Sequence, residues 1–147
     1  MQGTRTMPTV PYLRDQRHDG TVQEIAKLKF PYPNEERPDL ETIVNEPQPQ
    51  ISVGQHNGKD LFPDIVVVRR PGVWLQLMAE VETTDTVTDE SAEEQWLPFS
   101  RCGELLLYVP YGYASTAKKL CKKHGVTVSG IRIWRFRPVW GLEVAEA

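Results

Sequence analysis

The chain has 147 residues, a net charge of −3 at pH 7 and two cysteines. This length suits one domain whose core is large enough to fold without disulfide bonds or structural metals. Cys102 and Cys121 lack metal-motif spacing, so we expect small buried thiols in a reduced, cytoplasmic protein. We find no apolar run near the ~20 residues of a membrane span, and expect no signal peptide. These features argue against a secreted disulfide scaffold and a membrane protein.

Charge is distributed unevenly along the chain. Residues 1–100 carry 9 Lys and Arg against 17 Asp and Glu, whereas residues 101–147 carry 8 against 3. A basic C-terminal third beside an acidic pocket would suit a phosphodiester ligand, because phosphate responds to local potential more than to net charge. Chance also produces such asymmetry, and the overall charge argues against tight non-specific binding to DNA.

The N-terminal part predicts a single helix. Residues 1–20 are expected to form a mobile segment, and residues 21–147 a single domain. Thr21–Glu24 has the spacing of a capping box, which predicts a helix over residues 22–29 that stops before Pro31.

Only short elements are expected before the first long strand. Residues 39–44 favour a brief helical turn, and residues 51–55 a weak strand followed by a turn at residues 56–59. Lys59 in that turn is either a solvated lysine or one that reaches a neighbouring pocket. The histidines have no partner at ligand spacing, so no zinc site is expected at His18, His56 or His124.

Three carboxylates lie at the ends of two neighbouring predicted strands. Ile65–Val68 is apolar and β-branched throughout, which is typical of a central strand buried on both faces, and Asp64 precedes it. In the next strand, Val73–Glu82, alternation places Glu80 and Glu82 on one face, about 7 Å apart. The opposite face receives Leu75, Leu77, Ala79 and Val81. The two glutamates are either metal ligands or the solvated face of an edge strand.

The connection between these strands determines which residues face each other. Arg69–Gly72 contains Pro-Gly turn chemistry, so an antiparallel hairpin is expected. A tight two-residue loop would place Asp64 opposite Ala79, whereas a longer loop or a bulge would place it opposite Glu80. We favour the second register, because Pro-Gly turns often twist the wrong way for a tight hairpin.

Helices and strands alternate in the C-terminal half. A helix is expected from Thr88 to Gly103, with Pro98 kinking it or starting a new turn. The apolar run Leu105–Val109 predicts a second buried strand near the middle of the sheet. The remaining expected elements are a helix capped by Ser115 and ended by Gly125, and a strand over residues 126–128 or 131–136.

Residues 51–136 resemble the PD-(D/E)xK nuclease superfamily, in a diverged form whose second motif is E-x-E at residues 80–82. The resemblance implies an α/β fold with a mixed central sheet flanked by helices, as in restriction endonucleases. It also implies that Asp64 and Glu80 bind Mg²⁺ or Mn²⁺, with the Val81 carbonyl as a further ligand. Glu82 occupies the position of the motif lysine, where some restriction endonucleases also carry Glu.

Further residues of the chain extend the resemblance. Gln95 and Phe99 are similar to the Q-x-x-x-Y feature of RecB-like nucleases, with Phe in place of Tyr. The implied function is a metal-dependent nuclease with Asp64, Glu80 and Glu82 as catalytic residues. The alternative is an inactive nuclease-fold module that binds nucleic acid or protein. Phosphate contacts are expected at Lys118, Lys122 and Arg135, although the lysines also suit a solvated helix face.

Overall fold

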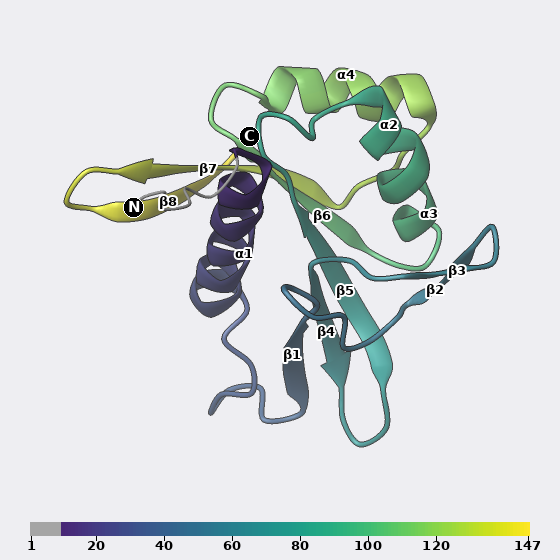
Figure 1. Cartoon of the computed structure of the whole chain (residues 1–147). Coiled ribbons are helices and arrows are strands. Elements are labelled where there is room, and N and C mark those ends of the chain that lie inside the picture. Colours follow the sequence, from purple (N-terminus) through teal and green to yellow (C-terminus); the bar gives the residue numbers. More distant parts are fainter. Residues whose placement is uncertain (1–9) are drawn as a thin grey trace, which may run out of the picture.

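The computed structural model describes residues 10–147, with side chains from Arg17 onward. It shows an α/β protein in which a mixed six-stranded sheet curls into a half-barrel between helices (Figure 1). The helical elements are α1 (Val10–Lys29), α2 (Asp89–Ser91), η1 (Ala92–Trp96), α3 (Leu97–Ser100) and α4 (Ala114–His124). The strands are β1 (Leu40–Val44), β2 (Gly54–His56), β3 (Lys59–Leu61), β4 (Ile65–Arg69), β5 (Trp74–Val81), β6 (Leu105–Pro110), β7 (Gly130–Arg137) and β8 (Gly141–Glu146).

The six strands lie in the order β1-β4-β5-β6-β7-β8. β1, β4 and β5 form an antiparallel meander, β5, β6 and β7 run parallel, and β8 returns antiparallel along the edge. The two parallel connections pass through α2–η1–α3 and α4. The predicted mixed sheet is therefore confirmed, with β6 near its middle.

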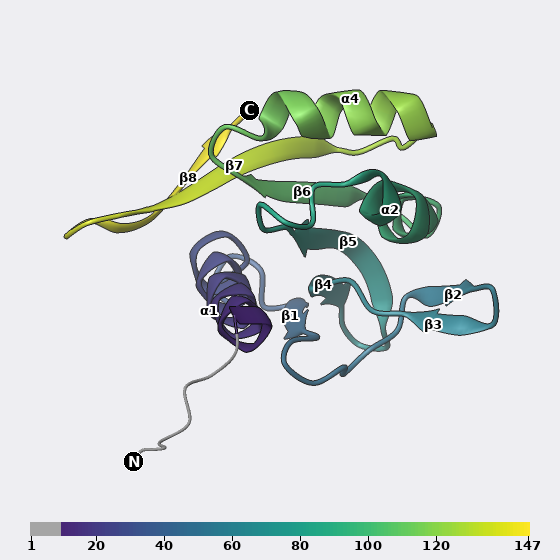
Figure 2. The same cartoon turned by 45° about the horizontal axis from the view of Figure 1, so that its top comes forward.

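Two apolar cores lie on opposite faces of the sheet. One contains Ile25 of α1 packed with Ala79 and Val81 of β5. The other contains Trp96 of η1 and Cys121 of α4. Figure 2 shows α1 on one side of the curled sheet and the other helices on the opposite side. The run Ile65–Val68 of β4 has exposures of 0–1%, which confirms the predicted strand buried on both faces, and its residues Ile65 and Val67 belong to the core that contains Ile25.

Helix α1 is longer than predicted. It begins at Val10, so the predicted start at residue 22 is wrong, and the helix crosses the expected domain boundary at residue 21. Thr21 lies inside the helix, where its Oγ1 donates to the Arg17 carbonyl at 2.8 Å instead of capping an N-terminus. Glu24 is exposed. The expected mobility of residues 1–9 lies outside the described residues.

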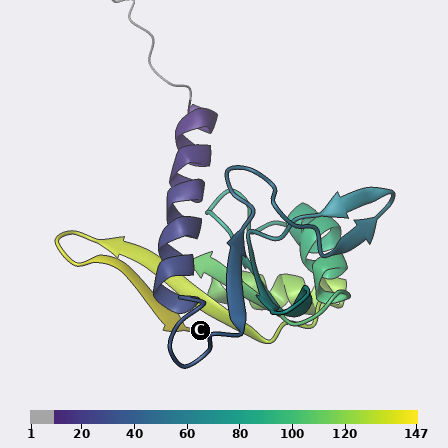
Figure 3. The ribbon, with the colours of Figure 1, turned by 90° about the horizontal axis from the view of Figure 1, so that it is seen from below.

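The segment before β4 also differs from the prediction. Residues 40–44 form the edge strand β1, paired antiparallel with β4, where a helical turn was expected. Thr42, Ile43 and Val44 are β-branched and therefore favour a strand, which the pairing with β4 stabilises. The turn at residues 56–59 is confirmed as the tight β2–β3 hairpin, with Asn57 and Gly58 both at positive φ. This hairpin and β7–β8 project on opposite sides of the molecule (Figure 3).

The helix after β5 contains a π turn. It begins after Thr88, close to the predicted start, and the Thr88 side chain caps it by accepting a hydrogen bond from the Ser91 amide. The Leu97 amide then donates to the Ala92 carbonyl, one residue further back than in an α-helix. Pro98 follows at the start of α3 and has no N–H for a regular helical bond. The wider turn accommodates this proline without breaking the helix.

The C-terminal elements match the prediction in part. Gly125 ends α4 in the left-handed conformation as expected, but Tyr113 is the N-cap and Ser115 lies inside the first turn. The last strand was predicted over residues 126–128 or 131–136, and β7 confirms the second range. β8 was not predicted. Within residues 10–147, no helix combines the length and apolar character needed to cross a bilayer.

Candidate metal centre

The β4–β5 hairpin places Asp64 beside Glu80. Ile65 pairs with Ala79, so Asp64, which directly precedes β4, lies next to Glu80. The register shifts between Val67 and Val68, whose partners are Leu77 and Leu75. This bulge confirms the favoured register. A bulge adds one residue to one strand and so reverses the alternation beyond it.

The bulge also corrects the predicted faces of β5. Leu75 packs with Met78 in the core beneath η1, whereas Leu77 packs with Ala79 in the core beneath α1. The prediction that Leu75 and Leu77 share a face is therefore wrong. Beyond the bulge, alternation holds from Leu77 to Val81, so the glutamates stay on one side of the strand.

Short hydrogen bonds hold the three predicted carboxylates in place. The Asp64 amide donates to Glu80 Oε1 at 3.0 Å, and the Val81 amide donates to Asp64 Oδ2 at 2.8 Å. Trp96 Nε1 donates to Glu82 Oε2 at 2.6 Å. The carboxylates are therefore fixed by backbone and side-chain donors rather than left mobile in solvent.

These three carboxylates are buried without a lysine or arginine partner. Asp64, Glu80 and Glu82 are only 3%, 7% and 3% exposed. Among the side chains from residue 17 onward, no lysine or arginine forms an ion pair with any of them. Burial of carboxylate charge that no lysine or arginine offsets is costly, so the cluster must retain protons or bind a cation. This arrangement is not the solvated edge of a sheet.

Burial raises the pKa of both glutamates. Desolvation, followed by the charges of Asp64 and Glu82, raises the pKa of Glu80 well above its ordinary value. A hydrogen bond with the Asp64 side chain also favours protonated Glu80. Burial raises the pKa of Glu82 to about 7, against the opposing effect of hydrogen bonds from Thr86 and Trp96. A cation between these carboxylates would replace the protons.

Two residues that the sequence did not indicate complete the cluster. His18 Nε2 of α1 lies 3.3 Å from Asp64 Oδ2 and 2.8 Å from the Val81 carbonyl oxygen. His18, Glu46 and Asp64 each offer a ligand atom, and these atoms all lie within 4.8 Å of one another. The prediction that His18 is isolated is therefore wrong.

The negative charge of Asp64 raises the pKa of both added residues, His18 and Glu46. Burial alone lowers the pKa of His18, but the hydrogen bond and charge of Asp64 and the bond to the Val81 carbonyl raise it to about 9. Burial and then the charge of Asp64 raise the pKa of Glu46 to about 7. His18 Nε2 thus places a positive charge beside two of the oxygens that the resemblance assigns to a metal.

A cavity of about 250 Å³ joins these side chains. Gln95 and Phe99 also line it, so the pair similar to the RecB-like feature reaches the site. The remaining lining residues are His18, Glu46, Phe62, Asp64, Glu80, Val81, Glu82, Thr83, Asp85 and Thr86. Five of the lining residues are acidic, and none is a lysine or an arginine.

The predicted nucleic-acid contacts lie away from this cavity. Lys118 and Lys122 are exposed on α4. Arg135 Nε pairs with Glu143 Oε1 at 2.8 Å, and its guanidinium lies 4.4 Å from the ring centroid of Tyr111. Their role in binding remains a prediction.

We expect the stability of the metal-free protein to fall as pH rises. The folded-state pKa of Glu82, about 7, exceeds its ordinary 4.5, so its stabilising contribution is complete below pH 4.5 and is lost as pH rises through 7. His18, raised from 6.5 to about 9, contributes fully below pH 6.5, and this contribution is lost as pH rises through 9. Urea unfolding in chelator at several pH values measures the loss of both stabilising contributions. Glu82→Gln should flatten the fall between pH 4.5 and 7, and an unchanged slope in that variant would contradict the assignment.

The bond between Trp96 and Glu82 should stabilise the fold measurably. Trp96→Phe removes the Nε1 donor and leaves a buried carboxylate oxygen unsatisfied, at a cost of about 1–3 kcal/mol. Trp140→Phe is the matched control, because Trp140 is 80% exposed and should change stability by less than about 0.5 kcal/mol. Urea unfolding at pH 8 compares the variants, and equal losses would argue against a specific role for the bond.

No family model, curated protein or solved structure matches this chain. Function is therefore inferred from the site itself.

Proposed function

We propose that this protein binds Mg²⁺ or Mn²⁺ at Asp64 and Glu80 and hydrolyses phosphodiester bonds of nucleic acid. The supporting observation is the pair of buried carboxylates on adjacent strands, in hydrogen-bond contact with each other and without a lysine or arginine among the described partners. Paired carboxylates that repel each other in a low-dielectric site gain most from a shared divalent cation.

The donors around the pair suit such a cation. Asp64, Glu80 and the Val81 carbonyl offer oxygen, the ligand type that Mg²⁺ prefers. Glu46 adds a fourth oxygen donor and His18 an imidazole nitrogen, which Mn²⁺ accepts more readily than Mg²⁺. His18 would have to lose its proton to ligate, so cation binding should compete with protons at this position.

The order of elements also supports the proposal. Apart from the inserted β2–β3 hairpin and the final strand β8, the chain contains a helix, three antiparallel strands, a helix, a parallel strand and a further helix and strand, in the order that the resemblance implies. The acidic residues lie at adjoining ends of β4 and β5, the second and third strands of this series. This position agrees with the one that the resemblance implies, which supports the proposal.

Each residue has a role in the proposed reaction. A bound cation would lower the pKa of a water molecule and offset charge developing on the phosphate. Asp64 and Glu80 would hold that cation. Glu82, fixed by Trp96, would orient the attacking water in place of the motif lysine. Gln95 lines the cavity beside these groups and is available to contact substrate.

One observation favours the alternative of an inactive binding module. The Glu82 carboxylate already accepts hydrogen bonds from Trp96 and Thr86, and no lysine lines the acidic cavity. In that case the buried cluster would be a structural cation site, and the fold would bind its partner without cleaving it.

Incubation with labelled single- and double-stranded DNA and RNA, in Mn²⁺ and in chelator, distinguishes these functions. Cleavage in Mn²⁺ alone that is lost in Asp64→Asn would support hydrolysis. Retention without cleavage would support the binding module. Neither cleavage nor binding on any of the four substrates would contradict the nucleic-acid assignment.

A further inference from the structure

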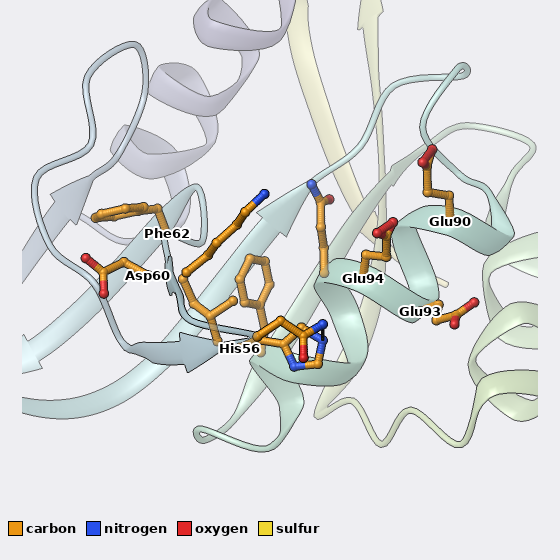
Figure 4. Close-up of a pocket in the computed structure, with 11 residues that line it drawn as sticks. His56, Asp60, Phe62, Glu90, Glu93 and Glu94 are labelled. Atoms are coloured by element: carbon orange, nitrogen blue, oxygen red, sulfur yellow. Dashed lines mark hydrogen bonds between the residues drawn. The ribbon is translucent and has the colours of Figure 1, made fainter.

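A larger cavity adjoins the acidic site. It has a volume of about 780 Å³ and lies between the β2–β3 hairpin and the α2–η1–α3 helix. Phe62, Gln95 and Phe99 line both cavities, so the two are neighbours that share walls. Figure 4 shows Glu90, Glu93 and Glu94 on the helical side of the larger cavity, with Asp60 and Phe62 across from them.

We propose that this cavity binds the substrate of the adjacent site, and that Lys59 and Gln95 contact a single phosphodiester group there. The substrate class is then a dinucleotide or a short single-stranded end, not a duplex. This inference rests on the proposed function and specifies its substrate.

The charges of the lining residues limit the number of phosphates. Four residues of the larger cavity are acidic, namely Asp60, Glu90, Glu93 and Glu94, and five more line the acidic cavity. Lys59 is the only lysine or arginine among the residues that line either one. Affinity for a long polyanion depends on several Lys or Arg contacts to phosphate, and repulsion from these carboxylates opposes it. One phosphate beside Lys59 is compatible with such walls.

Lys59 and Gln95 are available for a ligand. Both side chains are exposed, and neither forms an ion pair or a side-chain hydrogen bond with another residue of the described part of the chain. An ammonium group supplies a point charge and an amide supplies two N–H donors, which together suit phosphate oxygens.

Gln95 lies in the π turn and lines both cavities. Its neighbour Trp96 is fully buried and points to Glu82. Both residues lie within the widened turn between Ala92 and Leu97. Such turns recur at functional sites, and here the turn links the Glu82 carboxylate to the proposed phosphate contact.

The cavity also has the size and apolar surface that a nucleotide needs. A volume of 780 Å³ lies within the roughly 300–1,000 Å³ typical of small-ligand sites. Phe62 is 38% exposed, which gives a base an apolar surface beside the phosphate contacts.

A series of single strands of increasing length tests the substrate class. In Mn²⁺, we expect kcat/KM for a dinucleotide to lie within about threefold of that for a 20-mer, since one phosphate contact suffices. The logarithm of affinity should fall with that of salt concentration with a slope near −0.7, the value for one contact on a single strand. A slope that steepens with strand length, or a preference for duplex, would overturn the proposal.

Matched lysine variants test the contact itself. Lys59→Met should raise KM about tenfold, change kcat less than threefold and remove the salt dependence. Lys119→Met, on the exposed face of α4, should change neither parameter. Equal melting temperatures would show that both variants fold. Losses confined to Lys118→Met, Lys122→Met and Arg135→Met would place the phosphate contact elsewhere and contradict the proposal.

Binding without turnover separates this inference from the proposed hydrolysis. Calorimetric titration with a dinucleotide in Ca²⁺ reports the phosphate contact alone. Lys59-dependent binding without cleavage of any substrate in Mn²⁺ would support the cavity and refute the nuclease. Cleavage and binding that are both unchanged in Lys59→Met and Gln95→Ala would support the nuclease and refute the cavity.

Discussion

Glu80→Gln is expected to lower kcat for metal-dependent cleavage by at least ~100-fold, the scale on which removing one charge-stabilising group affects an active site. The amide cannot supply the negative charge that a divalent cation requires. It does mimic the protonated carboxyl, the form that burial favours at Glu80 by raising its pKa well above the ordinary value. The variant should therefore fold normally in chelator, and steady-state cleavage assays in Mn²⁺ would isolate the metal-dependent loss.

Glu36→Gln is the matched control, because Glu36 is exposed in the connection before β1. Its kcat should equal that of the wild type. Wild-type activity in Glu80→Gln would show that this carboxylate does not bind the catalytic cation, and equal losses in both variants would point to a non-specific effect.

Mn²⁺ is expected to raise the melting temperature of the wild type by roughly 8 °C at ~100-fold its dissociation constant. Binding only to the folded state contributes about 2.7 kcal/mol at that ratio. Near this chain length each kcal/mol raises the melting temperature by about 3 °C. Asp64→Asn should abolish the gain, because Asp64 contacts both His18 and Glu80. Thermal denaturation with and without Mn²⁺ at pH 7.5 measures both results.

Asp39→Asn provides the comparison for this measurement. Asp39 pairs with Arg37 at 3.0 Å on the surface, far from the cavity lining, so the metal-induced shift should be unchanged. A full shift in Asp64→Asn, or none in the wild type at millimolar Mn²⁺, would contradict cation binding at this carboxylate.

The β4–β5 hairpin could be predicted because its signals are local. Ile65–Val68 is β-branched and apolar, and the Pro-Gly turn disfavours the tight loop, so strand, burial and register followed from adjacent residues. The bulge that produces this register also moved Leu75 to the other face. The sequence favoured a longer loop or a bulge without giving the position of either, so the faces beyond the bulge could not be assigned.

β1 and the full length of α1 could not be predicted, because both depend on contacts between residues that are distant in the sequence. Leu40–Val44 becomes a strand because β4 offers a free edge, and no pattern within the five residues requires that pairing. In α1, the capping-box spacing at Thr21 suggested a helix start, but the packing of Val22 and Ile25 stabilises a helix that extends past it. Tertiary burial outweighed the local signals.

The candidate metal centre could be predicted only in part, for the same reason. Asp64 and Glu80 are 16 residues apart on one hairpin, whereas His18 and Val81 are 63 residues apart. Placing His18 required the full length of α1, and placing Glu46 required β1. The N-terminal part of α1 was not predicted, so His18 could not be assigned to the site. β1 was not predicted either, so Glu46 could not be assigned to it.

Crystals of the wild type grown with Mn²⁺ test the central claim most directly. Anomalous diffraction locates the ion without reference to activity, substrate or stability. The proposed site predicts one strong peak about 2.2 Å from carboxylate oxygens of both Asp64 and Glu80. A peak bound only by other residues, or no peak at this cavity at a concentration that saturates the thermal shift, would contradict the proposed metal centre.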